Sequence, residues 1–119
     1  MRGVKDFSNV YLYRQFVDFR KGINGLCTLV ESHLGLSSQE KSSLFVFCNR
    51  SRNKVRILYW DLTGFALWQK HLEEEKFKWP WCQQSESEQL NVQQLEWLLS
   101  GIDVTKLTTH KEKSYKKVV

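Results

Sequence analysis

Residues 44–81 have the sequence LFVFCNRSRNKVRILYWDLTGFALWQKHLEEEKFKWPW, which predicts several strands joined by tight turns. Side chains on a strand alternate between two faces, whereas those on a helix return every three to four residues. Leu44–Cys48 is apolar throughout, and Val55–Trp60 alternates at first and is then apolar on both faces, as in a strand covered on each side. Phe65–Leu72 predicts a third strand after turn residues at Asp61–Gly64. We therefore expect an antiparallel meander with Val55–Trp60 in a central position.

The connections of this meander follow from local composition. Asn49–Asn53 joins the first two strands, and its two Asn residues favour a hairpin because Asn adopts positive φ at low cost. Glu73–Glu75 is too charged to be buried, so it is expected to turn the chain in solvent. In residues 76–81, aromatic residues alternate with Lys or Pro, which predicts a fourth strand with one buried face. Pro80 lacks the N–H of a sheet ladder, so this strand is expected at an edge.

Two amphipathic segments flank the meander. The first is expected to begin near Asp18, whose carboxylate can cap free amides, and to end at Gly35. Its apolar side chains recur at helical spacing: Phe19, Ile23, Leu26, Cys27, Val30 and Leu34. Gly22 and Gly25 lie inside this helix, where glycine is unfavourable, so we expect another backbone to pass close to them.

The second helix has a clear N-terminal signal. Asn91 is followed three residues later by Gln94, and Leu90 is placed to pack on Leu95, as in a capping box with a hydrophobic staple. The expected buried stripe is Leu95, Leu98, Leu99 and Ile102. Val10–Val17 is β-prone and is expected to join the sheet. The sequence thus predicts an α+β fold: a small curved antiparallel β-meander of about five strands, with two packed helices, one after the first strand and one C-terminal.

Length and cysteine content bound the class of protein. The 119 residues fit one domain, which we place at residues 1–105, and the lysine-rich, apolar-poor segment 106–119 predicts a disordered basic tail. Cys27, Cys48 and Cys82 are odd in number and lie in apolar contexts, which is typical of reduced thiols in a cytoplasmic protein. Without a signal peptide or an apolar run of membrane-spanning length, we expect no membrane association.

The formal net charge of +5 is unevenly distributed along the chain. Residues 1–60 carry a net charge of +6, residues 61–105 carry −5, and residues 106–119 carry +4. Such polarity favours a polyanion on one side of the molecule and a basic protein partner on the other.

The best binding candidate is the hairpin at residues 50–56. It carries four cations at a two-residue spacing: Arg50, Arg52, Lys54 and Arg56. On a regular ribbon these side chains would share one face and reach successive phosphates, although a solvated hairpin that resists edge aggregation has the same pattern. Arg20 and Lys21 can join this patch from the start of the first helix, and we add Lys70 to the candidate nucleic-acid-binding residues.

Aromatic residues offer a second way to bind nucleic acid. Four tryptophans, Trp60, Trp68, Trp79 and Trp81, are candidate stacking platforms for unpaired bases, but aromatic residues at strand spacing more often belong to a core.

Catalytic groups are scattered. His33, His71 and His110 have no Cys, Asp or Glu at metal-ligand spacing, and Cys82 has no neighbouring base, so we expect no metal, no cofactor and no catalytic residue. The alternative is a small metal-dependent nuclease, which requires acids that converge within about 4 Å of paired ions. Its candidate acids are Asp18, Asp61, Asp103 and Glu73–Glu75, although Asp18 fits a helix cap better and Asp61 a turn.

Five motifs occur in order along the chain. They are DFRKGINGL at 18–26, VRILYWD with Gly64 at 55–64, KHLE at 70–73, FKWP at 77–80 and LLSGID at 98–103. In this order they resemble the signatures of the accessory protein TnpB (Orf2) of the insertion sequence 66 family, which is unrelated to the RNA-guided nuclease of the same label. The chain departs from the family pattern in places: the family usually has Gly at Ser51 or Asn53, often Gly at Glu75, a basic residue at His71, and Thr-Pro where this chain has Asn91-Val92.

The resemblance implies a small protein encoded beside a separate, longer DDE-type transposase and needed for full transposition, with no catalytic residues of its own. We therefore expect a non-catalytic accessory protein that binds DNA, the transposase of its element, or both. On this interpretation the basic hairpin and first helix contact phosphate and the acidic half contacts protein. The alternatives are the nuclease built on Asp18 and Asp61, and a scaffold that contacts proteins only.

Overall fold

The computed structural model describes residues 6–81 and 87–101, which form a five-stranded sheet with the order β4-β3-β2-β1-β5. The strands are β1 (Asn9–Tyr13), β2 (Ser43–Cys48), β3 (Lys54–Asp61), β4 (Gly64–His71) and β5 (Ser87–Leu90). β2, β3 and β4 form the predicted antiparallel meander, whereas β1 runs parallel to β2 and antiparallel to β5. The sheet is therefore mixed, because the helical segment between β1 and β2 serves as the crossover that a parallel pair requires.

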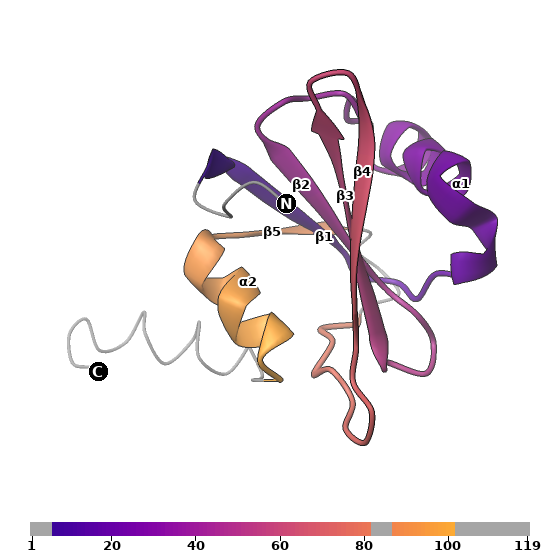
Figure 1. The fold of residues 1–119 in the computed structure, drawn as a ribbon, viewed down its shortest axis with the longest axis vertical. Helices are drawn as coiled ribbons and strands as arrows, with labels where there is room; N and C mark the ends of the chain where they lie inside the picture. Colours follow the sequence, from indigo (N-terminus) through magenta and orange to yellow (C-terminus); the bar gives the residue numbers. More distant parts are fainter. Residues whose placement is uncertain (1–5, 82–86, 102–119) are drawn as a thin grey trace.

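The helices lie on opposite sides of this sheet (Figure 1). The first helical segment comprises a 3₁₀ turn η2 (Phe19–Lys21), α1 (Gly22–Thr28) and a π-helical turn η3 (Leu29–His33). The second is α2 (Val92–Leu99). The predicted α+β class with two helices, one after the first strand and one C-terminal, is confirmed. Among the described residues, no helix combines the length and apolar character needed to cross a bilayer.

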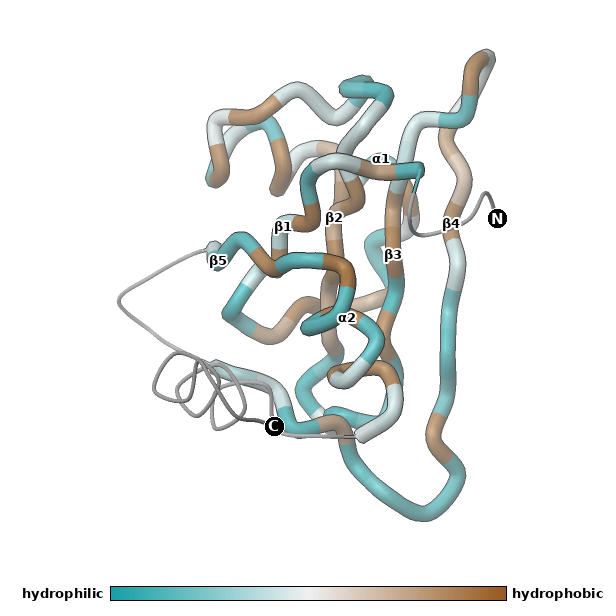
Figure 2. Tube along the Cα trace, turned by 90° about the vertical axis from the view of Figure 1, so that its left-hand side faces the viewer, coloured by the Kyte–Doolittle hydropathy of each residue, from teal (hydrophilic) through white to brown (hydrophobic). Residues whose placement is uncertain are grey.

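Strand alternation divides the core into two clusters. On the α2 side, the strands bury Val10, Leu12, Leu44, Val46, Cys48, Val55, Ile57 and Tyr59. On the α1 side, they bury Tyr13, Phe45, Phe47 and Leu58. Every residue of β2 is buried, and after Ser43 the strand is apolar throughout, as expected when both faces of a strand are covered. Figure 2 shows hydrophobic residues concentrated along β2 and β3 and hydrophilic ones in the connection after β4.

The predicted strand at residues 76–81 is wrong. These residues have no regular backbone structure, yet Phe77 and Trp79 are buried in the α2-side core, and Lys78 between them is exposed. The Phe77 N–H donates to the Arg52 carbonyl at 2.7 Å, which ties the segment to the β2–β3 turn and not to a strand. The alternation of aromatic residues with Lys or Pro in this segment therefore reflects alternating burial of the side chains, not pairing with a neighbouring strand. The fifth strand is β5, which the sequence analysis did not predict, and β1 ends at Tyr13, so only the first half of Val10–Val17 joins the sheet.

The first helical segment is interrupted near its start. Asp18 caps η2, as predicted, and Gly35 follows the segment with φ of +66°. Gly22 has φ of +72°, which breaks the helix between η2 and α1, and no atom lies within 4 Å of a Cβ built there. At Gly25, the nearest atoms to such a Cβ belong to the Lys21 side chain. The expectation that another backbone passes close to these glycines is therefore wrong.

The start of α2 confirms the predicted capping box. The Gln94 N–H donates to the Asn91 side chain at 2.7 Å, and the Asn91 N–H donates to the Gln94 side chain at 2.9 Å. Leu90, Leu95 and Leu98 are buried together in the α2-side core. The remaining predictions for this end of the chain lie outside the described residues: those for Cys82, Ile102, Asp103, His110 and the tail 106–119.

Candidate nucleic-acid interface

A hollow of about 740 Å³ opens where the β2–β3 hairpin meets the segment that leads from β1 into α1. Its lining comes from three parts of the chain: Tyr13 and Phe16–Lys21, Leu29 and His33, and Asn49–Ser51 with Lys54 and Arg56. The π-helical turn η3 contributes both Leu29 and His33, and His33 Nδ1 lies 3.2 Å from the Tyr13 hydroxyl. We call this feature the basic hollow, because five cationic side chains line it: Arg20, Lys21, Arg50, Lys54 and Arg56.

The side chain of Asn49 shapes the hairpin at the rim of the basic hollow. Its Oδ1 accepts hydrogen bonds from the Asn53 and Lys54 N–H groups, each at 3.1 Å, and its Nδ2 donates to Asn53 Oδ1 at 2.8 Å. The expected positive φ does not occur at either Asn; Arg52 adopts it instead, with φ of +60°. The turn therefore ends the regular ribbon, and of the four hairpin cations only Lys54 and Arg56 keep the predicted strand spacing.

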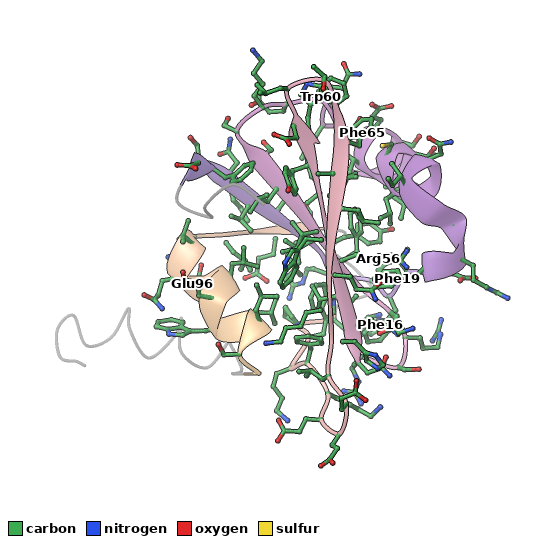
Figure 3. All side chains as sticks on the ribbon, viewed as in Figure 1. Phe16, Phe19, Arg56, Trp60, Phe65 and Glu96 are labelled. Carbon is green, nitrogen blue, oxygen red and sulfur yellow. The ribbon has the colours of Figure 1, made fainter. Side chains whose placement is uncertain are left out.

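Arg56 holds the start of the first helical segment against β3. Its Nη1 donates to the Phe19 carbonyl at 2.8 Å, its Nε donates to Gln69 Oε1 at 2.6 Å, and its guanidinium lies 4.6 Å from the centroid of the Phe19 ring. Figure 3 shows Arg56 and Phe19 together beside the sheet, with Phe16 nearby. Because two of its donors are already used, Arg56 positions the wall of the hollow more than it offers a free charge.

Arg20 is compensated by an acid. Its Nη2 lies 2.7 Å from Asp18 Oδ2 and its Nε donates to both carboxylate oxygens, while Asp18 Oδ1 also accepts from the Arg20 N–H at 3.0 Å. These hydrogen bonds from Arg20 lower the pKa of Asp18 to about 2. At neutral pH the pair is therefore ionised and contributes little net charge to the hollow.

Lys21, Arg50 and Lys54 supply the uncompensated charge. Within the ranges 6–81 and 87–101, no hydrogen bond or ion pair engages the side chain of any of the three. They come from the end of η2, the hairpin turn and the start of β3, so the fold brings together cations that are distant in sequence. Such a concave surface carries a positive potential that attracts anions.

The structure does not bring Arg52 and Lys70 to the basic hollow. The Arg52 side chain does not line it, and the Arg52 carbonyl is used by the Phe77 N–H. Lys70 pairs with Val55 in the sheet and therefore lies on the α2 side, where its Nζ donates to the Leu99 carbonyl at 2.9 Å. This bond satisfies a free carbonyl at the end of α2.

The geometry does not support a nuclease built on Asp18 and Asp61. Asp18 lies at the basic hollow beside Phe19, which Arg56 contacts, whereas Asp61 is five residues further along β3, roughly 16 Å at the rise of a strand. Paired catalytic ions lie about 4 Å apart, so these two carboxylates do not form one such site. In the part of the chain that the structure describes, no three His, Cys, Asp or Glu residues are grouped so that they could hold a metal ion.

Aromatic side chains divide between the core and the hollow. Trp79 is only 7% exposed, so the expected core role holds for this residue, and Trp68 packs partly buried against the same cluster. Trp81 does not share this core position, because its side chain is 48% exposed. Phe16 and Phe19 also line the hollow. Phe19 was predicted only as an apolar residue of the first helix, and neither residue was predicted as part of a binding site; their signal in the sequence is an aromatic residue on each side of Asp18, in a segment that joins a strand to a helix.

The fold and the hollow define a small α+β protein with a concave basic surface. The chain belongs to the IS66 Orf2 like protein family, whose model matches residues 8–109.

Two relatives from Sinorhizobium fredii are the uncharacterized proteins y4jC and y4hO. The first is 36% identical over 93 residues, which cover 78% of each chain. The second is 32% identical over 94 residues, which cover 79% of this chain and 80% of the relative. No solved structure matches this chain. Membership of the family supports an accessory role in transposition.

Proposed function

We propose that this protein binds DNA through the basic hollow and thereby assists the transposition of its insertion sequence, without catalysing the reaction itself. The observation that carries the proposal is the convergence of Lys21, Arg50 and Lys54 around one concave surface, with no ion pair to an acid among the described residues. Cations placed in this way can neutralise successive phosphates and release their counterions, which is the main source of non-specific DNA affinity.

The acidic half of the chain is the proposed protein-binding side. Glu73, Glu74 and Glu75 are exposed in the connection after β4, and none of them lines the basic hollow. A DNA-binding transposase presents basic surface, so we propose the separately encoded DDE transposase of the element as the partner of this side, in the cytoplasm. Opposite charges on different surfaces allow the protein to contact DNA and transposase together.

The salt dependence of DNA affinity tests the proposal. Fluorescence anisotropy with a labelled duplex should give a dissociation constant of roughly 10⁻⁴ to 10⁻⁶ M at physiological salt, and its logarithm should change linearly with the logarithm of salt concentration. Replacing Arg50 and Lys54 by Gln removes two charges and should lower the slope by about 1.8, or about 0.9 for each lost phosphate contact.

A matched variant distinguishes the effect of contacts at the hollow on the salt slope from the effect of net charge. Replacing Lys41 and Lys78 by Gln also removes two charges, but neither residue lines the basic hollow. This variant should keep a slope close to that of the unmodified protein. Equal slopes for both double variants would remove the hollow from the proposal, and the absence of DNA binding by the unmodified protein would leave protein contact as the surviving alternative.

A further inference from the structure

An exposed tryptophan, Trp81, contacts Phe16, one of the residues that line the basic hollow. Trp81 and Leu62 are the two large hydrophobic side chains that the described residues leave exposed, at 48% and 73%. The Trp81 ring is stacked on Phe16, with centroids 6.2 Å apart and planes inclined by 21°. Phe16 in turn lines the hollow with Arg50 and Lys54. An aromatic surface therefore adjoins a surface of uncompensated cations.

Hydrogen bonds hold the residues that lead into Trp81 against the segment after β1. The indole N–H of Trp79 donates to the Arg14 carbonyl at 3.1 Å, and Arg14 Nε donates to the Pro80 carbonyl at the same distance. The Trp81 N–H donates to the Trp79 carbonyl at 2.8 Å. Trp79 itself is buried in the core. Trp81 is thus held in place before any ligand arrives, which lowers the entropic cost of stacking on it.

We infer that the basic hollow binds unpaired DNA, with a base stacked on the exposed face of Trp81 and the adjoining phosphates on Lys21, Arg50 and Lys54. This inference rests on the proposed function and names the form of DNA that the same site takes. Basic grooves with exposed aromatic rings are the usual means of binding single strands, because every unpaired base offers a π-face to a ring. In a duplex those faces are covered by neighbouring bases. The hollow, at about 740 Å³, is also within the size range of sites that enclose small ligands.

Three DNA probes of equal length distinguish binding to bases from binding to phosphates. They are a labelled oligothymidylate, an abasic strand with the same number of phosphates, and a duplex. Oligothymidylate should bind more tightly than the abasic strand at the same salt concentration. Replacing Trp81 by Ala should weaken oligothymidylate binding by about 5-fold to 150-fold, the usual range for loss of one stacked base, and should leave the abasic strand and the duplex nearly unchanged.

Two further variants serve as controls. Trp81→Phe retains an aromatic ring and should recover most of the affinity for oligothymidylate, which a general loss of folding would not allow. Leu62→Ala removes the other exposed hydrophobic side chain, which lies in the turn between β3 and β4 and does not line the hollow. Its affinity for all three probes should equal that of the unmodified protein.

The results distinguish this inference from the proposed function. If Trp81→Ala weakens all three probes equally, or none of them, the inference is overturned, while a salt slope that still depends on Arg50 and Lys54 leaves the proposed function standing. If the unmodified protein binds none of the three probes, both are overturned.

Discussion

Among residues 6–81 and 87–101, Asp18 is the only acidic side chain that lines the basic hollow, so its replacement should strengthen DNA binding. The Asp18→Asn substitution removes the charge that compensates Arg20 but keeps a side-chain oxygen to accept from the Arg20 N–H. The Arg20 side chain is 89% exposed and would become available to a phosphate. One additional contact steepens the log–log salt slope by about 0.9, so at about 0.1 M salt affinity should rise by up to about 8-fold.

The assay is fluorescence anisotropy with one DNA probe from about 50 to about 200 mM salt. Asp61→Asn is the matched control, because it removes the same charge at the far end of β3. Asp61 lies five residues beyond Arg56, roughly 16 Å along the strand, which exceeds the screening length of about 10 Å at 0.1 M salt. Its affinity should remain close to that of the unmodified protein. Equal affinities for Asp18→Asn and the unmodified protein, or equal gains in both variants, would refute the reasoning.

Three further predictions concern the framework of the hollow. Arg56→Lys keeps the charge but cannot reproduce both hydrogen bonds of the guanidinium, so urea denaturation should show a loss of about 1–2 kcal/mol in unfolding free energy. Asn49→Ala leaves two hairpin N–H groups without their acceptor and should cost about 1–3 kcal/mol in the same assay. The pKa of Asp18 is about 2 in the folded protein and about 3.9 in the unfolded chain. Its contribution to the unfolding free energy is therefore complete above the higher pKa and is lost as pH falls through the lower one. The Asp18→Asn variant should lack this loss of stability in acid unfolding.

The central part of the fold was predictable because its strands carry their own signals. Val55–Trp60 and Phe65–Leu72 have β-branched or aromatic residues bounded by turn residues, and both strands were found close to the predicted limits. The cap of α2 was equally clear, since both partners of its capping box are close in sequence. For these elements, local patterns were sufficient.

The errors in the sheet come from contacts that are distant in sequence. Ser87–Leu90 has a mostly polar composition and becomes a strand because it pairs with β1, almost eighty residues earlier. Residues 76–81 have the alternation of a strand, but their Phe77 amide is paired with the β2–β3 turn. No local pattern indicates which backbone will be the neighbour of a given segment.

The candidate site was predictable in part for the same reason. The sequence identified Lys21, Arg50 and Lys54 by their charge. It could not show that the Arg56 side chain donates a hydrogen bond to the Phe19 carbonyl, or that the Lys70 side chain donates one to a carbonyl at the end of α2. Asn49 was expected to shape the turn through its backbone, whereas it acts through its side chain.

The most direct test of DNA contact at the basic hollow is a titration of ¹⁵N-labelled protein with oligothymidylate, followed by the backbone amide signals. We expect the largest shifts in residues 16–21 and 49–56, which contribute most of the lining. Signals from α2, on the opposite side of the sheet, should change little. Shifts concentrated on α2 and around Lys70 would contradict the account, as would the absence of any shift at saturating DNA.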